Sequence, residues 1–190
     1  FNVRPPYPAS ENFLKIQDEY LSELIRQRGI TEASDLPRVK SNPKITLWQG
    51  DITTLGCNAI VNAANSTLLG CWQPCHSCID NMIHSLSGVQ LRIKCSEIMQ
   101  AQGHEEKTGT AKITPAYNLP CKYVLHTVGP VISGPLRQSD CKLLADCYQS
   151  CLKLAAANEL QSVAFCCIST GVFHFPQEQA AEIAVGTVRN

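Results

Sequence analysis

The sequence predicts an α/β fold in which a mixed sheet is flanked by helices. Short apolar runs alternate along the chain with longer segments of helical periodicity. Residues 58–62 place small and β-branched residues between two asparagines, and residues 162–168 are apolar after Ser162; both patterns are typical of strands buried on both faces. The chain has 190 residues, of which 44% are hydrophobic and 17% charged, so it can build one globular domain with an ordinary core.

Residues 1–43 are expected to form a helical N-terminal extension, ahead of a core at residues 44–190. The first eight residues are rich in proline and therefore extended. A helical pattern of apolar residues starts at Ser10 and stops at Gly29, and Pro37 and Pro43 mark a connector. The extension is expected to pack its apolar stripe on the core; an arm that binds a partner is the alternative.

The core is expected to alternate strands and helices in chain order. Strands are predicted at residues 44–47, 58–62, 109–115, 122–128 and 162–168, and helices at 79–98, 136–157 and from 177 to the end. In such sheets ligands bind beyond the carboxyl ends of strands. We therefore expect the loops at residues 50–53, 62–78 and 169–175 to line one cleft.

Composition excludes several classes of protein. The formal net charge is zero, which argues against a broad basic surface, so nucleic acid is not expected as a partner. No apolar run is long enough for a membrane helix, and no secretory signal opens the chain, although its start at Phe1 suggests that the initiator end is missing. Eleven cysteines, an odd number, in a chain of this size indicate a reducing cytoplasm, with Cys57, Cys95, Cys166 and Cys167 expected on buried surfaces.

Candidate metal ligands and other polar site residues are most concentrated between residues 62 and 84. Cys71, His76 and Cys78 offer two thiolates and one imidazole, a set that suits zinc and leaves a fourth coordination position open. A closed structural site that also uses Cys75 is one alternative, but adjacent ligands Cys75 and His76 would have difficulty reaching one metal. A reduced, metal-free loop is the other alternative.

Polar residues around this loop allow two interpretations each. Asp80 could cap the helix that follows, or it could orient or deprotonate a water or hold a ribose hydroxyl. His84 and His126 are expected to be structural. Asp51 could accept a hydrogen bond from an exocyclic amine or cap its own turn through Thr53. The small-residue loop at 169–175 precedes a helix, and its backbone N–H groups could bind a diphosphate; an ordinary strand-to-helix turn is the alternative.

Four segments together resemble a macrodomain. They are GDIT at residues 50–53, VNAAN at 61–65, YVLHTVGP at 123–130 and ISTGVFHF at 168–175, and their order and spacing match over residues 44–190. The insert at residues 70–84 and the helical extension are similar to the zinc-dependent microbial branch of macrodomain protein-ADP-ribose hydrolases. In that branch a Cys-x4-His-x-Cys set holds zinc, which falls on Cys71, His76 and Cys78 and leaves Cys75 out.

The resemblance implies a three-layer α/β/α fold with a cleft for ADP-ribose. Asp51 and Ile52 would contact the adenine, and Asn62 and Asn65 the distal ribose. The residues that would wrap the diphosphate are Ser169, Thr170, Gly171, Val172 and Phe173. The metal loop replaces the Gly-Gly-x-Asp loop of another hydrolase type, whose mechanism therefore does not transfer. The family also carries a strand and a helix after the position of Asn190, so a truncated chain is expected.

These observations favour an enzyme, a protein-ADP-ribose hydrolase that removes mono-ADP-ribose from modified side chains with the help of zinc; acidic side chains are the expected acceptors. Asn65 would fix the distal ribose and Asp80 would position or activate the attacking water, as the two catalytic residues. ADP-ribose and a mono-ADP-ribosylated protein are the expected partners. A non-catalytic ADP-ribose reader is the alternative, and turnover of ADP-ribosylated protein separates the two.

Overall fold

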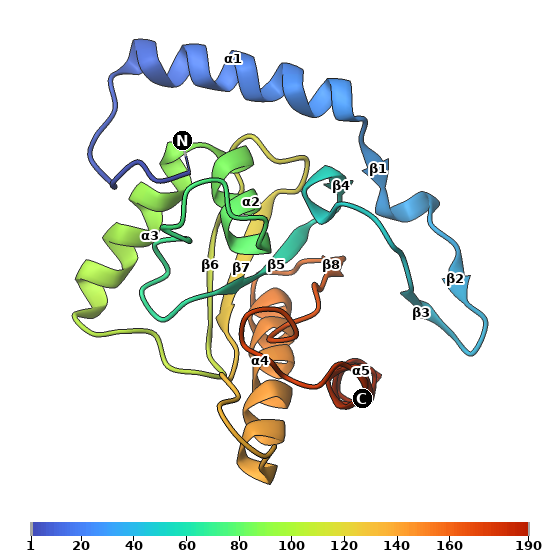
Figure 1. Ribbon diagram of the computed structural model, residues 1–190. Coiled ribbons are helices and arrows are strands. Elements are labelled where there is room, and N and C mark those ends of the chain that lie inside the picture. The colour runs from blue at the N-terminus through green and yellow to red at the C-terminus, as the bar shows by residue number, and fades with distance from the viewer. Residues whose placement is uncertain (1, 190) are drawn as a thin grey trace.

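A four-stranded mixed sheet forms the centre of the molecule (Figure 1). The computed structural model describes residues 2–189. In spatial order the strands are β6 (Ala111–Pro115), β7 (Tyr123–Val128), β5 (Ala59–Ala64) and β8 (Val163–Ala164). Strand β5 runs parallel to β7 and β8, whereas β6 is antiparallel to β7. Because β5, β7 and β8 are parallel, their carboxyl ends meet at one edge, where the candidate loops that follow β5 and β8 begin; the loop at residues 50–53 instead follows β3, which belongs to a separate sheet with β2.

Helices cover both faces of this sheet and complete three layers. On one face lie α2 (Ile79–Ser87) and α3 (Val89–Gln102), and on the other α4 (Gln138–Ala157) and α5 (Gln177–Val188). Neighbouring residues of β5 point to opposite faces: Ile60 belongs to the core under α2 and α3, and Val61 to the core under α4 and α5. The predicted α/β/α class is confirmed.

The N-terminal extension contains one long helix, α1 (Glu11–Arg28), at the predicted place. The Ser10 hydroxyl accepts a hydrogen bond from the N–H of Phe13, and Gly29 ends the helix with φ of 82°, a value that favours glycine. The short elements that follow are β1 (Thr31–Glu32), η1 (Ala33–Asp35), β2 (Arg38–Val39) and β3 (Asn42–Thr46). Strand β1 pairs in parallel with β4 (Leu55–Gly56), after η2 (Ile52–Thr54).

The extension also contributes directly to the core. Gln17, Leu21 and Ile25 form the buried face of α1. The side-chain oxygen of Gln17 accepts a hydrogen bond of 2.9 Å from the N–H of Val89, the first residue of α3. This side chain therefore caps α3 from a helix 72 positions earlier in the sequence.

Three expectations about local structure are wrong. The helix expected at 79–98 is two helices, because Gly88 adopts φ of 99° and ψ of 174°, which interrupts the helix. The buried strand expected at 162–168 is only Val163–Ala164, because β8 pairs with β5 alone and its other edge has no partner strand among residues 2–189. Cys167 is consequently exposed, and Cys57 and Cys166 are only half-buried.

All eleven cysteines are free thiols. Of the four that the sequence placed on buried surfaces, only Cys95 is fully buried. Across residues 2–189, no helix combines the length and the apolar character that crossing a bilayer requires.

Candidate metal centre and ligand cleft

Three predicted metal ligands lie together in the loop between β5 and α2. The ligating atoms of Cys71, His76 and Cys78 are all within 4.8 Å of one another, and all three residues are half-buried. The Cys71 sulfur lies 3.6 Å from Nδ1 of His76. In tetrahedral zinc sites a sulfur and a nitrogen ligand lie about 3.6 Å apart, so the spacing fits the metal that the ligand types predict.

The protonation state of these thiols affects metal binding, because a metal binds the thiolate form. Burial raises the pKa of the Cys78 thiol, the N–H of Asn81 opposes that shift, and the neighbouring Cys71 adds to it. Near neutral pH the Cys78 thiol therefore stays protonated by itself. A divalent cation bound between the two sulfurs would hold both as thiolates.

Cys75 is not part of this set. It is exposed and adopts φ of 54°, a left-handed conformation, between Pro74 and His76. Its sulfur lies 3.6 Å from the side-chain nitrogen of Asn2. The structure thus separates Cys75 from the three ligands that the spacing selects.

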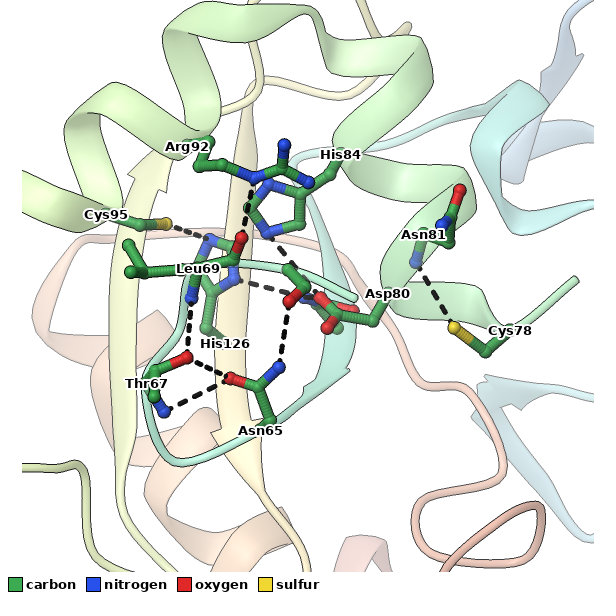
Figure 2. Close-up of polar contacts among 12 residues, drawn as sticks. Asn65, Thr67, Leu69, Cys78, Asp80, Asn81, His84, Arg92, Cys95 and His126 are labelled. Atoms are coloured by element: carbon green, nitrogen blue, oxygen red, sulfur yellow. Dashed lines mark hydrogen bonds and ion pairs between the residues drawn. The ribbon is translucent and has the colours of Figure 1, made fainter. Parts of the chain in front are cut away.

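Asn65 folds the start of the metal loop, which we define as residues 65–78. Its side-chain oxygen accepts hydrogen bonds from the N–H and the hydroxyl of Thr67, at 3.1 and 2.6 Å. Its side-chain nitrogen donates to the carbonyl of Gly70 at 2.9 Å (Figure 2). Gly70 adopts φ of 79°, and a Cβ there would lie 2.9 Å from the His84 ring. Asn65 and Gly70 therefore set the path of the chain into Cys71.

The residue that caps α2 is Cys78, so the interpretation of Asp80 as the N-cap is wrong. The Cys78 sulfur accepts a hydrogen bond of 3.4 Å from the N–H of Asn81. Asp80 is already the second residue of the helix. A thiolate at a helix N-terminus is stabilised by the helix dipole, which favours Cys78 as a metal ligand.

Asp80 is a buried carboxyl group with only 5% of its surface exposed. Its Oδ1 accepts a hydrogen bond of 2.8 Å from Asn62 and lies 3.5 Å from Nε2 of His84 (Figure 2). Burial raises the pKa of Asp80 to about 6, although the Asn62 hydrogen bond and the positive charge of Arg92 act in the opposite direction. A carboxyl group with such a pKa can accept a proton near neutral pH.

Asn62 lies in β5 and is completely buried. Its side-chain nitrogen donates to Asp80 and also lies 3.2 Å from Nδ1 of His126, the residue opposite it in β7. The Asn62 side chain is therefore engaged in holding Asp80. Contact of Asn62 with a ribose stays a prediction, as does the same role for Asn65.

A second group of potential ligating atoms lies in the core, in His84, Cys95 and His126. Nε2 of His126 lies 2.9 Å from the Thr114 hydroxyl, so both of its nitrogens have polar neighbours. Burial lowers the pKa of His126 to about 4 and raises the pKa of Cys95 to about 12, which leaves both groups neutral. We interpret this group as packing beneath Asp80.

The loop expected to bind a diphosphate follows β8. Ser169 is buried with φ of 65°, and its hydroxyl has no hydrogen-bond partner among residues 2–189. Within the same range, no protein acceptor engages the N–H groups of Gly171, Val172 and Phe173. Thr170 donates its hydroxyl to the Cys167 carbonyl. Successive free N–H groups form an anion-binding concavity, which suits a phosphate.

The loop is fixed at its two ends. The N–H of Phe175 donates to the Ser169 carbonyl at 3.0 Å, and the N–H of Ile132 donates to the Phe173 carbonyl at 2.9 Å. A Cβ at Gly129 would lie 2.0 Å from the Ser169 hydroxyl, so glycine is required for this close approach. At Gly171, in contrast, a Cβ would meet no atom within 4 Å.

Asp51 has the capping contacts that the sequence offered as one alternative. Its Oδ1 accepts from the N–H and the hydroxyl of Thr53, at 2.9 and 2.6 Å, and Oδ2 forms an ion pair of 2.8 Å with Arg28 of α1. The next residue, Ile52, packs against the same core as Ile79 of α2. Adenine contacts by Asp51 and Ile52 stay predictions.

Sequence reasoning missed one residue of this region, Arg92. It lies in α3, and its guanidinium group contacts the metal loop through the carbonyl of Leu69. Nothing in its sequence context marks it, because its neighbours Leu91 and Ile93 belong to an ordinary helical pattern. His84 could be anticipated, since it follows Asp80 by one helical turn.

Comparison with known proteins identifies the family of the chain. The family described as Macro domain matches residues 61–184. A "Protein-ADP-ribose hydrolase" of Treponema medium is 66% identical over the whole chain, which covers 73% of that relative, and one of Staphylococcus aureus strain MSSA476 is 57% identical, with 71% covered. The Trypanosoma brucei macrodomain in complex with ADP-ribose matches with a TM-score of 0.75 and 33% identity, over 96% of this chain and 79% of that one. The chain therefore belongs to the macro domain family.

Proposed function

We propose that this protein is a hydrolase that removes mono-ADP-ribose from modified protein side chains. The observation that carries the proposal is the buried carboxyl group of Asp80 beside a set of three soft metal ligands, at the sheet edge where ligands of α/β proteins bind. The names of the similar proteins of Treponema medium and Staphylococcus aureus support it.

The reaction we propose is hydrolysis at the anomeric carbon of the distal ribose. Water forms a new bond from its oxygen to this carbon, and the bond to the side-chain oxygen of the modified protein breaks with its electron pair. The products are free ADP-ribose and the restored side chain, for which we favour a carboxylate. Glycosyl transfer of this kind passes through an oxocarbenium-like state.

Asp80 is suited to take the proton of the attacking water. Its raised pKa, about 6, lies close to neutral pH, where a carboxylate combines sufficient ionisation with sufficient basicity. Asn62 holds one carboxyl oxygen through a hydrogen bond of 2.8 Å, which fixes the orientation of the group. Asn65 would fix the distal ribose, at the turn that leads into the metal loop.

We further propose zinc as the resident cofactor, with Cys71, His76 and Cys78 as ligands. The distance of 3.6 Å from the Cys71 sulfur to Nδ1 of His76 and the soft ligand types support this choice. When bound, zinc would supply a Lewis acid with one open coordination position for an oxygen of the ribose or water.

Binding of ADP-ribose would use the loop after β8 and the turn after β3. The free N–H groups of residues 171–173 support placing the diphosphate there. Asp51 and Ile52 would contact the adenine, and the Asp51 side chain stays 38% exposed in its ion pair with Arg28. The free state of all eleven cysteines supports a reducing, cytoplasmic location.

Mass spectrometry of a mono-ADP-ribosylated acceptor tests this function directly. The acceptor is measured before and after incubation with zinc-loaded protein, next to the Cys78→Ala variant as a control. We expect loss of the whole ADP-ribosyl mass with the wild-type protein only. Tight binding of ADP-ribose without release from ester-, amide- or ether-linked acceptors would instead identify a reader.

A further inference from the structure

Arg92 of α3 joins the metal loop to the N-terminus of the chain. Only 3% of its surface is exposed. Its Nε donates to the Leu69 carbonyl at 2.6 Å, its Nη1 to the Arg4 carbonyl at 2.6 Å, and its Nη2 to the Asn2 carbonyl at 2.7 Å. One buried cation thus engages backbone acceptors from two segments that are about ninety and twenty-three positions away in the sequence.

The same guanidinium group contacts the metal loop on both sides of a ligand. Leu69 precedes Cys71 by two residues, and Trp72 follows it directly. The central carbon of the Arg92 guanidinium lies 4.6 Å from the centre of the Trp72 ring, a cation–π contact. The path of the chain through Cys71 is therefore held between a hydrogen bond and a ring contact.

The N-terminal segment is folded so that it can serve as an acceptor. We call residues 2–8 the N-terminal strap. Arg4 donates to the carbonyls of Tyr7 and Pro8, at 2.8 and 3.1 Å, and its guanidinium lies 5.6 Å from the centre of the Phe13 ring in α1. The side chain of Asn2 also reaches Cys75 in the metal loop. The strap thus links α1 to the metal loop.

The metal loop needs such support because it has little structure of its own. Between the end of β5 at Ala64 and the start of α2 at Ile79 there is no helix or strand. Three ligating atoms from an irregular loop converge on one point only if the backbone is held in place. Groups around a metal site that orient its ligands commonly contribute substantially to metal affinity.

We propose that Arg92 is a positioning residue for the zinc site, which it holds by tying the N-terminal strap to the metal loop. The inference rests on the zinc site proposed above. It makes the N-terminal extension a structural part of the metal centre, although the extension contains none of the ligands. Arg92 would act through the backbone around Cys71 and would not contact the metal or the substrate.

Zinc affinity of the full chain tests this inference, measured by competition with a chromogenic chelator. Arg92→Met keeps the length of the stem but removes all the donors, and Arg92→Lys keeps the charge but loses the planar fork. We expect Arg92→Met to weaken zinc binding about 10- to 100-fold, the range for residues that orient ligands, and Arg92→Lys to fall between it and the wild type. Lys94→Met is the matched control, because Lys94 lies on the same helix, half-exposed, in an ion pair with Glu97.

Thermal unfolding with and without zinc separates positioning from a general loss of stability. At a fixed zinc concentration, zinc raises the melting temperature by an amount that grows with the logarithm of its affinity for the folded state. A positioning role predicts a smaller zinc-induced shift in both Arg92 variants and an unchanged shift in Lys94→Met. A purely structural role would lower the melting temperature with and without zinc by the same amount.

The outcomes distinguish the positioning role of Arg92 from the zinc site on which it rests. If the wild-type protein binds zinc and both Arg92 variants bind it equally well, the inference is overturned and the zinc site stands. If Arg92→Met does not fold, an unchanged zinc affinity in Arg92→Lys overturns it equally. If the wild-type protein binds no zinc, the metal proposal fails, and the inference fails with it.

Discussion

Replacing Asp80 by asparagine separates its proposed chemistry from its structural contacts. An amide at this position has the same shape as the carboxyl group, and its oxygen can still accept the 2.8 Å hydrogen bond from Asn62. It cannot take up a proton. We therefore expect Asp80→Asn to fold normally, to retain zinc and ADP-ribose, and to lose hydrolysis by a factor of ~10²–10⁴, the usual contribution of a general base.

Asp80→Ala supplies the magnitude of the structural contribution. Since Cys78 and not Asp80 caps α2, no capping energy is lost. The side-chain nitrogen of Asn62 loses its carboxylate acceptor in a fully buried environment. A buried donor left without an acceptor costs about 1–3 kcal/mol. The free energy of unfolding of Asp80→Ala should therefore be lower by that amount than that of Asp80→Asn, since both variants remove the buried charge and only the asparagine keeps an acceptor for Asn62.

Three assays measure these effects on the same preparations. Single-turnover release of ADP-ribose, followed by mass spectrometry, gives the chemical step; calorimetry gives the affinity for free ADP-ribose; and urea titration gives stability. Wild-type turnover in Asp80→Asn would refute the assignment of Asp80 as proton acceptor. A parallel loss of turnover and ADP-ribose affinity would assign it to substrate binding instead.

Three further predictions concern the metal, the diphosphate and the buried core. Metal analysis of protein purified without added zinc should find about one zinc per chain, as a single three-ligand set requires. Cys75→Ala should retain the zinc and Cys78→Ala should lose it. Equal loss in both variants would indicate a closed four-ligand site. Gly171→Glu should abolish ADP-ribose binding in calorimetry by placing a carboxylate at the diphosphate, whereas Gly171→Ala should bind normally, because its Cβ meets no atom within 4 Å; unchanged affinity in the glutamate variant would contradict the placement. Burial lowers the pKa of His126 to about 4. The neutral form therefore stabilises the fold above the unfolded pKa of about 6.5. About 3 kcal/mol of the free energy of unfolding is lost as the pH falls from about 6.5 to about 4. Urea titrations across that pH window compare the zinc-free Cys78→Ala variant with and without His126→Gln. The free energy of unfolding should depend less on pH when His126 is replaced. An equal slope in the two proteins would refute the assignment of the pH dependence to His126.

Local sequence patterns predicted much of the fold. The caps of α1 at Ser10 and Gly29 are signals within one helical turn, and the structure uses both. Strand β5 was predicted because residues 58–62 are rich in small and β-branched residues, which is typical of strands buried on both faces. The metal ligands could also be predicted from local sequence. Cys71, His76 and Cys78 lie within eight residues, so two thiols and one imidazole can reach one metal ion.

What depends on distant residues could not be predicted. The limits of β8 depend on which strands flank it, since apolar content alone does not distinguish an edge strand from a central one. Asp is preferred to Cys as an N-cap in general, yet Cys78 takes that position in α2. The engagement of Asn62 by Asp80, 18 residues away, follows from the packing of α2 on β5 and has no local pattern.

The hydrogen bond from Val89 to Gln17 couples the opening of two helices. The N–H of Val89 is the first donor of α3, and its acceptor belongs to α1. When α1 detaches, this amide loses its partner and the first turn of α3 loses its cap. We therefore expect the rate at which the Val89 amide exchanges its hydrogen with solvent to report the undocking of α1.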